Sequence, residues 1–408
     1  MQKRHQRYWA FIIVCIVFST VILHSNTAIA NEDENLTVHL HKTSKLALEK
    51  RQLPTPIPRF VYDTGLKFDY PEYVRGIYVT GPSAGINRFN DLINFVKETD
   101  LNSMVIDVKE DYGNLTFKPD EDSPYYEFAQ GYIRDPRAML ERLEEEGIYP
   151  IARVVVFKDS LLAESRPEWS FVKDGKVWKN NRDEAFVNPF IKDVWDYNVE
   201  IAIMAAKLGF KDIQFDYVRF PEGFERRDEE LQYSQGDYAD ADLDNVQKRV
   251  QAVTDFVAYA KDKLEPYGVD VSVDIFGYSA TIPEAPGIGQ NFTKISENVD
   301  VISSMIYPSH WTPYFGISFP DKEPYRLITE YAKVENERLG ELENPPTSRP
   351  WIQDFSAPWL YYNEPVKRYG KEEVEAQIKA LNENGIYEFL LWNPNNKYTK
   401  NVDYTPLD

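Results

Sequence analysis

The sequence predicts an α/β fold, a (β/α)8 TIM barrel with extended loops after its strands. From residue 74 onward, eight short, β-branched apolar runs alternate with amphipathic segments of helical period. Connections that lead from helix to strand are short, and those that leave the strands are long, which is typical of a barrel with its chemistry at the carboxyl face. A doubly wound open sheet is the alternative, but it rarely needs eight strands, and no G-x-G-x-x-G or Walker motif follows a strand.

Each element follows from its own residue pattern. The expected strands are Val74–Thr80, Ser103–Lys109, Tyr149–Phe157, Ile213–Phe220, Asp270–Gly277, Asp300–Tyr307, Pro350–Ser356 and Tyr387–Asn393. The expected helices are Phe89–Thr99, Pro136–Glu146, Val194–Leu208, Val246–Leu264, Tyr325–Leu339 and Lys371–Asn382, with only a weak or short helix between Gly277 and Asp300. In the loop 158–190, Phe171–Trp178 indicates a hairpin on an Asp-Gly turn.

Composition narrows the functional classes. The 408 residues include 46 Lys and Arg against 66 Asp and Glu, a net charge of −20. A nucleic-acid partner is not expected, because phosphate binding needs a basic face. The same charge disfavours a strongly anionic polymer as substrate, although a local basic patch can override the net charge.

The first thirty residues predict export. Three basic residues precede an apolar run from Trp9 to Leu23, and Ala28-Ile29-Ala30 forms an A-x-A cleavage site. We therefore expect a signal peptide over residues 1–30, a linker or strap over 31–70 and the barrel over 71–408. An uncleaved anchor is the rival interpretation, because the apolar run is marginal for spanning. After cleavage at Ala30 we expect a secreted or envelope-associated protein that keeps no membrane span. We also expect the protein to be a monomer.

The scarcity of His and Cys limits the chemistry. The single cysteine, Cys15, lies in the predicted signal peptide, and His310 is the only histidine within the predicted barrel. A cysteine nucleophile and a zinc site with two or three histidines are therefore excluded. We expect no cofactor and no metal, although a site made of carboxylates alone stays possible. A pair of carboxylates on a rigid frame, the equipment of glycoside hydrolysis, also remains.

Strand alternation selects the carboxylates. In 213–217 the apolar residues face the helices, so Asp216 faces the barrel interior, and the same argument places Asp274 inward on the next strand. The same alternation places Asp107 inward on the second expected strand, and it places Lys109, two residues later, on the same face. The competing interpretation is that such aspartates are structural partners of Lys109, Arg153 or Arg219.

Aromatic residues gather at the ends of the expected strands. Sugar rings stack on aromatic faces, while charged and amide side chains bind hydroxyl groups. Core packing is the alternative for any single aromatic residue. We expect Asp216 and Asp274 to be catalytic and Arg219 to orient Asp216. The expected substrate-binding residues are Tyr78, Asp107, Lys109, Arg153, Arg219, Tyr307, His310, Trp311, Gln353 and Trp392.

Four segments resemble a known family. Val74–Thr80, Ile106–Gly113, Ile213–Pro221 and Val273–Gly277 are similar to segments of a bacterial family of secreted glycoside hydrolases with TIM-barrel domains. The resemblance covers residues 70–400. The segment Ile213–Pro221, on the fourth expected strand, also looks like a segment of barrel hydrolases distantly similar to the α-amylase clan.

The resemblance implies roles for the two aspartates. In that clan the strand-four aspartate is the nucleophile and the strand-five acid is the proton donor, which would make Asp216 nucleophile or base and Asp274 general acid. The clan usually has Glu on strand five, so Asp274 leaves open whether configuration is retained or inverted.

These expectations lead to one main function and two rivals. The main prediction is a secreted glycoside hydrolase that cleaves an extracellular or cell-wall polysaccharide or oligosaccharide. A non-catalytic carbohydrate-binding barrel of the cell envelope is the alternative, and a carboxylate-bound metal enzyme is the weaker third.

Overall fold

The structure, a computed structural model, describes residues 61–360 and 365–405. The predicted signal peptide and residues 31–60 of the predicted strap lie outside the described residues. Within the described part, no helix combines the length and the apolar character that crossing a bilayer requires.

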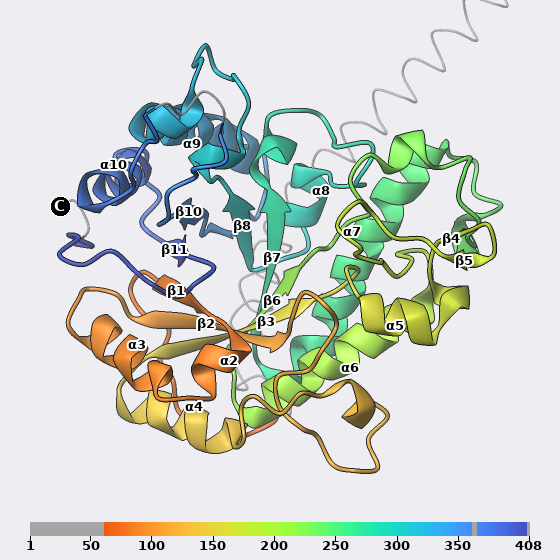
Figure 1. Ribbon diagram of the computed structural model, residues 1–408, viewed down its shortest axis with the longest axis horizontal. Coiled ribbons are helices and arrows are strands. Elements are labelled where there is room, and N and C mark those ends of the chain that lie inside the picture. Colours follow the sequence, from red (N-terminus) through yellow and green to blue (C-terminus); the bar gives the residue numbers. More distant parts are fainter. Residues whose placement is uncertain (1–60, 361–364, 406–408) are drawn as a thin grey trace, which may run out of the picture. The chain divides into compact units, whose positions relative to one another are not determined.

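Parallel strands form the centre of the described part (Figure 1). The strands of the main sheet are β1 (Arg75–Val79), β2 (Ser103–Lys109), β3 (Tyr149–Val155), β6 (Asp212–Asp216), β7 (Asp270–Phe276), β8 (Val301–Met305), β9 (Thr347–Ser348), β10 (Trp351–Gln353) and β11 (Phe389–Trp392). Hydrogen bonding runs in the order β10-β11-β1-β2-β3-β6-β7-β8-β9, and β8 also pairs with β10. This last pairing closes the ring, so the predicted eight-stranded (β/α)8 barrel is confirmed.

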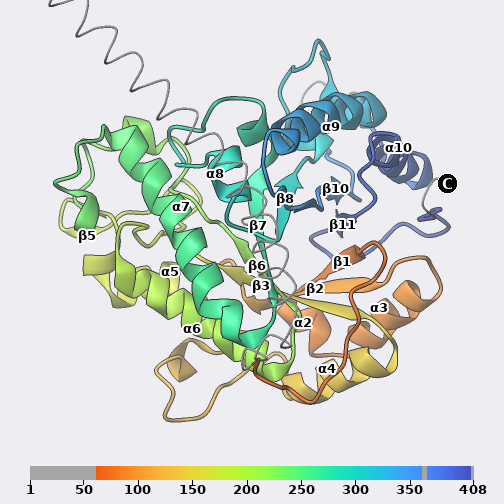
Figure 2. The same ribbon diagram turned by 180° about the vertical axis from the view of Figure 1, so that it is seen from behind.

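Helices surround the barrel on its outside, as the front and back views show (Figures 1 and 2). They are α2 (Gly81–Ala84), α3 (Arg88–Lys97), α4 (Pro136–Glu145), α5 (Ser160–Ser165), α6 (Lys192–Leu208), α7 (Asn245–Leu264), α8 (Phe292–Ser296), α9 (Pro324–Gly340) and α10 (Lys371–Asn382). The expected short helix before β8 is the five-residue α8. The expected hairpin is also present, as β4 (Val172–Lys173) and β5 (Lys176–Val177) around Asp174 and Gly175, both with positive φ.

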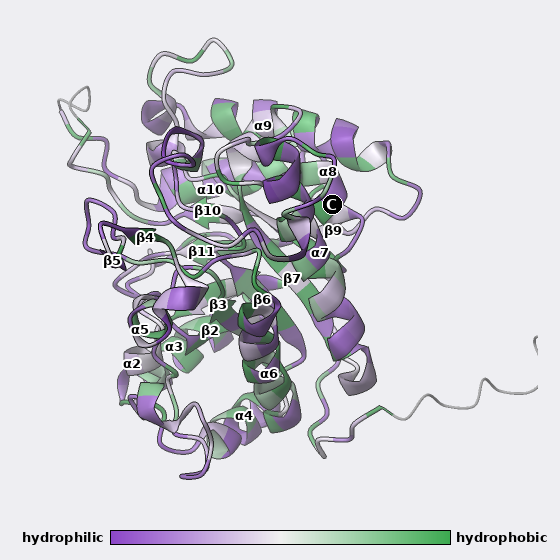
Figure 3. Cartoon of the chain, turned by 90° about the vertical axis from the view of Figure 1, so that its right-hand side faces the viewer, coloured by the Kyte–Doolittle hydropathy of each residue, from purple (hydrophilic) through white to green (hydrophobic). Residues whose placement is uncertain are grey.

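The apolar core has two parts. The larger part packs the outward faces of the strands against the helices. Figure 3 shows this as hydrophobic strands at the centre with helices that carry both hydrophobic and hydrophilic residues. A smaller cluster includes Val105, Ile151, Tyr307, Trp351 and Leu390, which alternate with the outward-facing positions. It supports the polar groups above it at the carboxyl ends of the strands.

One predicted strand ends early. The expected strand Ile213–Phe220 stops at Asp216, because Tyr217 has a left-handed backbone with φ 53°. A tyrosine rarely adopts this conformation, which costs on the order of 1 kcal/mol or more. The turn lifts Tyr217 out of the strand and leaves Asp216 as its last residue.

The described end of the predicted strap packs under the barrel. Leu66 is buried, and the Tyr70 hydroxyl accepts a bond from Arg349 Nη2 (2.8 Å) and donates to Glu388 (2.9 Å). The fully buried Arg349 also bonds Asp212 through Nη1 (2.7 Å). This polar layer fills the amino end of the barrel and leaves the carboxyl end for the cavity.

Candidate active site

A cavity of about 340 Å³ opens at the carboxyl ends of the strands. It lies where the long connections after the strands meet, as the sequence predicts. Eight of the predicted site residues line it: Tyr78, Arg153, Asp216, Arg219, Asp274, Tyr307, His310 and Trp392. The structure thus brings together residues that lie up to 314 positions apart in the chain.

Asp216 is a buried carboxylate held in one orientation. Its Oδ2 accepts hydrogen bonds from Arg153 Nε (2.9 Å) and Nη2 (2.6 Å), and its Oδ1 accepts the backbone N–H of Tyr217 (2.6 Å). Charge-assisted hydrogen bonds from a guanidinium, together with one from a backbone amide, hold the carboxyl in one place. Asp216 is therefore suited to act as a fixed negative charge.

Arg153 is the centre of the charge network. Besides Asp216, its guanidinium bonds Asp107 Oδ1 and Asp111 Oδ1, each at 2.7 Å. Asp107 Oδ2 in turn accepts from the Tyr78 hydroxyl (2.6 Å). Asp107 therefore lies behind the cavity wall, not in it, and supports Arg153 instead of binding substrate directly.

The expectation that Arg219 orients Asp216 is wrong, because Arg153 does so. The early end of β6 explains the difference, since the left-handed turn at Tyr217 removes Arg219 from the strand. Arg219 instead donates to the carbonyl of Phe220 (3.1 Å) and to Glu222 Oε1 (3.2 Å). It still lines the cavity, beside Tyr217.

The environment of Asp274 differs from that of Asp216, because its hydrogen-bond donor is uncharged. Its side chain is buried on β7, with 2% of the residue exposed, and its Oδ1 accepts one hydrogen bond from Trp351 Nε1 (2.8 Å). Burial, and after it the negative charge of Asp216, raise the pKa of Asp274 well above its usual range. Asp274 is therefore the carboxyl that keeps its proton.

The two aspartates lie at the same level of neighbouring strands. Phe215 of β6 is in register with Val273 of β7, so the next pair is Asp216 and Asp274. Neighbouring strands are about 4.8 Å apart, which places both carboxyls within reach of one small group. A carboxyl held by a guanidinium and a carboxyl with a raised pKa, both facing one cavity, can form an acid/base or acid/nucleophile pair.

Aromatic rings form another part of the cavity wall. Tyr307 and Trp392 lie 4.8 Å apart between ring centroids, and Phe355 follows 5.1 Å from Trp392. Trp359 stacks on Phe355 at 6.0 Å and is 58% exposed. The row leads from the cavity toward solvent, and such ring faces suit sugar rings.

His310 stands at the edge of this wall. Its Nδ1 lies 3.0 Å from Ser309 Oγ, and its ring lies 5.2 Å from that of Tyr307. Although part of the ring reaches solvent, partial burial lowers its pKa. A neutral imidazole at the cavity is able to exchange hydrogen bonds with hydroxyl groups.

The expectation that Lys109 faces the barrel interior and binds substrate is wrong. The register of β2 against β3 shifts between Asp107 and Lys109, so a bulge turns Lys109 out of the barrel. Its ammonium is buried and bonds Asp159 Oδ2 (2.6 Å), Asn198 Oδ1 (2.9 Å) and the carbonyl of Val155 (2.9 Å). Lys109 thus holds loop and helix to the barrel and does not reach the cavity.

Trp311 and Gln353 also lie outside the cavity. Trp311 is 8% exposed and packs against Tyr314 and Tyr331, so it is a core residue. Gln353 Oε1 accepts the N–H of Ser309 (3.0 Å), which makes Gln353 a support for the turn that carries His310.

Sequence reasoning missed several lining residues. They are Asp111, Arg182, Tyr217, Glu222, Phe276, Met305, Trp351 and Pro394. Asp111, Arg182, Glu222 and Pro394 come from loops whose course the periodicity does not determine. Tyr217, Phe276, Met305 and Trp351 lie within predicted strands, and the position of Tyr217 at a strand end was a signal for it.

The described residues contain no group of three or more His, Cys, Asp or Glu placed to hold a metal ion. The residues that gather at the cavity instead combine two carboxyls in different environments with an aromatic wall. This arrangement supplies proton transfer, a fixed negative charge and sugar-sized ring faces in one place.

Comparisons with known proteins identify a family and a similar fold. The model of a family described as "Putative glycosyl hydrolase domain" matches residues 76–398. No curated protein matches the sequence. Among solved structures, the glycoside hydrolase domain of PgaB from Bordetella bronchiseptica is similar at 14% identity, over 79% of this chain and 94% of that one, with a TM-score of 0.56. This likeness supports the barrel fold.

Two other solved structures are more distant in shape. A hypothetical protein from Ruminiclostridium thermocellum is 28% identical over 48% of this chain and 96% of its own, with a TM-score of 0.41. An α-amylase from Lactobacillus plantarum is 12% identical over 78% of this chain and 70% of its own, with a TM-score of 0.48.

Proposed function

The chain belongs to this family of glycosyl hydrolase domains, and we propose that it cleaves O-glycosidic bonds of an extracellular or cell-wall polysaccharide. The observation that carries the proposal is the split environment of two neighbouring carboxyls. Asp216 is fixed by Arg153 and a backbone amide, whereas Asp274 is buried with one neutral hydrogen-bond donor.

The chemistry follows from these environments. Asp274 donates its proton to the glycosidic oxygen as the bond to the leaving group breaks. Asp216 either attacks the anomeric carbon or activates a water molecule, and its charge stabilises the oxocarbenium-like centre. Arg153 orients Asp216 through two hydrogen bonds, while Tyr307 and Trp392 hold the sugar ring by stacking.

The rate should depend on pH through Asp274. A general acid works while it is protonated, and burial raises the pKa of Asp274 above its usual range. We expect kcat/KM to stay high at neutral pH, where a free aspartate would be ionised, and to fall as pH rises through this raised pKa. A pH profile of kcat/KM checks this, and a rate that already falls near pH 4 would assign the proton to another group.

Binding without turnover is the rival function. Isothermal titration calorimetry with a panel of oligosaccharides, followed by chromatographic analysis of the same mixtures, separates the two. The proposal expects shorter products from at least one bound sugar. Tight binding with every oligosaccharide recovered intact would instead identify a carbohydrate-binding barrel.

We also propose that the protein acts outside the cytoplasm. The support is the basic start, the apolar run and the Ala28-Ile29-Ala30 site in the first thirty residues. Expression of the full chain with N-terminal sequencing should find Asn31 as the first residue of the exported form. A chain that keeps Met1 in the membrane fraction would identify an anchor instead.

A further inference from the structure

A second, smaller cavity adjoins the first. It measures about 210 Å³ and is lined by residues of the loops after β3 and β6. Arg182 and Glu222 line both cavities, so the two lie side by side. Nothing in the proposed chemistry uses this second cavity, which extends the site to one side of the acid pair.

Arg227 lies in the wall of this cavity, and its charge acts on Glu230 only at a distance, without an ion pair. Its guanidinium carbon lies 5.4 Å from the ring centroid of Trp178, which orients the planar group. Its Nε is buried and has no hydrogen-bond partner among the described residues, and none of their carboxylates forms an ion pair with it. Glu230, three residues along the loop, is bonded to Lys173 at 2.8 Å instead.

Arg182 faces the same space. Its side chain is 64% exposed and its Nε is 3.0 Å from Glu184. Its terminal nitrogens make no hydrogen bond to any residue that the structure describes, so they are available to a ligand. The one carboxylate in the wall, Glu222, is held by Arg219 at 3.2 Å. The lining is therefore locally basic, although the chain as a whole carries −20.

The second cavity lies on the side of the barrel opposite the aromatic residues. In the closed ring, β3 and β6 lie across the barrel from β10 and β11. Phe355 and Trp359 lie in the loop after β10, and Trp392 ends β11; together they form the aromatic row. Figure 1 shows this separation, with β4 and β5 of the β3 loop at the right and β10 and β11 at the left. A glycan that crosses the acid pair therefore has an aromatic end and an arginine end.

We propose that Arg182 and Arg227 form a subsite for the carboxylate of a uronic acid unit in the substrate glycan. Guanidinium groups pair with carboxylates in a planar, two-pronged geometry, and Trp178 supplies a surface that keeps Arg227 oriented. The inference rests on the proposed function and narrows its substrate class from glycans in general to acidic glycans.

The test measures binding, so that it does not depend on turnover. The probes are glucuronate- and galacturonate-containing oligosaccharides and the same oligosaccharides after carboxyl reduction, titrated by calorimetry into the Asp274→Asn protein. We expect at least one acidic oligosaccharide to bind about tenfold tighter than its reduced form. Arg227→Gln and Arg182→Gln should each remove most of that preference.

Arg226→Gln is the matched control, because Arg226 is the adjacent arginine, is 86% exposed and lies outside both cavities. It should keep the preference in full. If Arg227→Gln proves unstable in thermal denaturation, the exposed Arg182 carries the test. Equal binding of acidic and reduced probes, or a preference that survives both variants, would overturn the subsite and leave the proposed function standing. Tighter binding of a sulfated neutral oligosaccharide would overturn the assignment to a carboxylate.

Discussion

Asp216→Asn is expected to lower kcat/KM for the polysaccharide substrate by about 10³-fold or more. The amide keeps the size of the side chain and loses the charge that Arg153 fixes, so the developing positive charge at the sugar is no longer stabilised. Asp274→Asn should have a comparable effect on natural linkages, because the leaving oxygen then receives no proton.

The two variants should differ toward an activated substrate. A nitrophenyl glycoside has a leaving group that departs without protonation, so Asp274→Asn should retain much more activity on it than on the polysaccharide. Asp216→Asn should stay inactive on both. The reverse pattern in steady-state kinetics would exchange the two roles.

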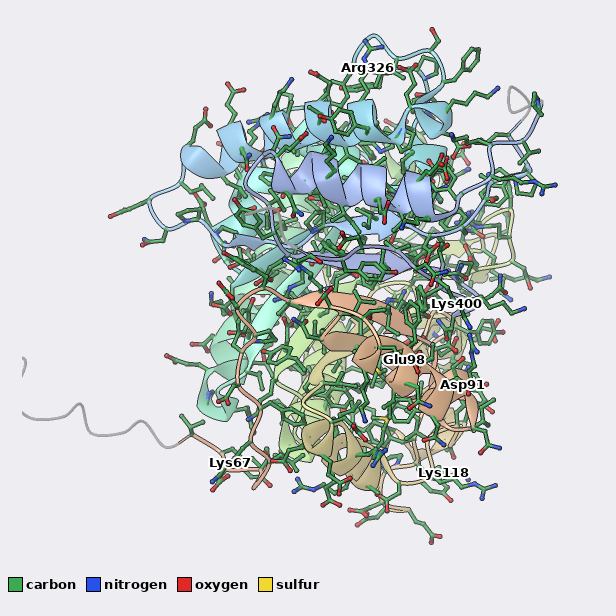
Figure 4. All side chains as sticks on the ribbon, turned by 90° about the vertical axis from the view of Figure 1, so that its left-hand side faces the viewer. Lys67, Asp91, Glu98, Lys118, Arg326 and Lys400 are labelled. Carbon is green, nitrogen blue, oxygen red and sulfur yellow. The ribbon has the colours of Figure 1, made fainter. Side chains whose placement is uncertain are left out.

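Asp91→Asn is the control for both variants. Asp91 lies on α3 away from the cavity, and Figure 4 shows it at the surface. Its replacement should leave kcat/KM unchanged. Thermal denaturation of all three variants separates lost chemistry from lost folding.

Lys109→Met is expected to cost the protein about 3–5 kcal/mol of stability. The substitution leaves the carboxylate of Asp159 buried without its partner, although both side chains are fully buried in the native protein. It also removes the donor to Asn198 and to the carbonyl of Val155. Urea denaturation followed by circular dichroism measures the change.

The exposed ion pair of Lys173 and Glu230 is the control for the buried pair of Lys109 and Asp159. Lys173→Met breaks the exposed pair with Glu230 and should cost at most about 1 kcal/mol. A similarly small loss for Lys109→Met, together with weaker substrate binding, would return Lys109 to the sugar site that the sequence predicts for it. A large loss supports the structural role that the bulge gives it.

The sequence predicts the barrel well because barrel strands and helices have local signatures. The predicted strand Ser103–Lys109 and the predicted helix Lys371–Asn382 have the same ends in the structure. The positions of Asp216 and Asp274 follow from the alternation of regular strands, which needs no knowledge of distant contacts.

Where the backbone departs from regularity, the prediction fails. The bulge in β2 reverses the parity of Lys109, and the left-handed turn at Tyr217 gives the orienting role to Arg153 instead of Arg219. No residue type marks either feature in the sequence. The arginine subsite is beyond local reasoning for another reason, since Arg182 and Arg227 come from two loops that only the folded chain brings together.

The central claim is that Asp216 and Asp274 together break a glycosidic bond. The most direct measurement is the release of reducing ends from one polysaccharide by the wild type, Asp216→Asn and Asp274→Asn under identical conditions. We expect steady release by the wild type and near-background release by each variant. Full release by both variants would contradict the claim.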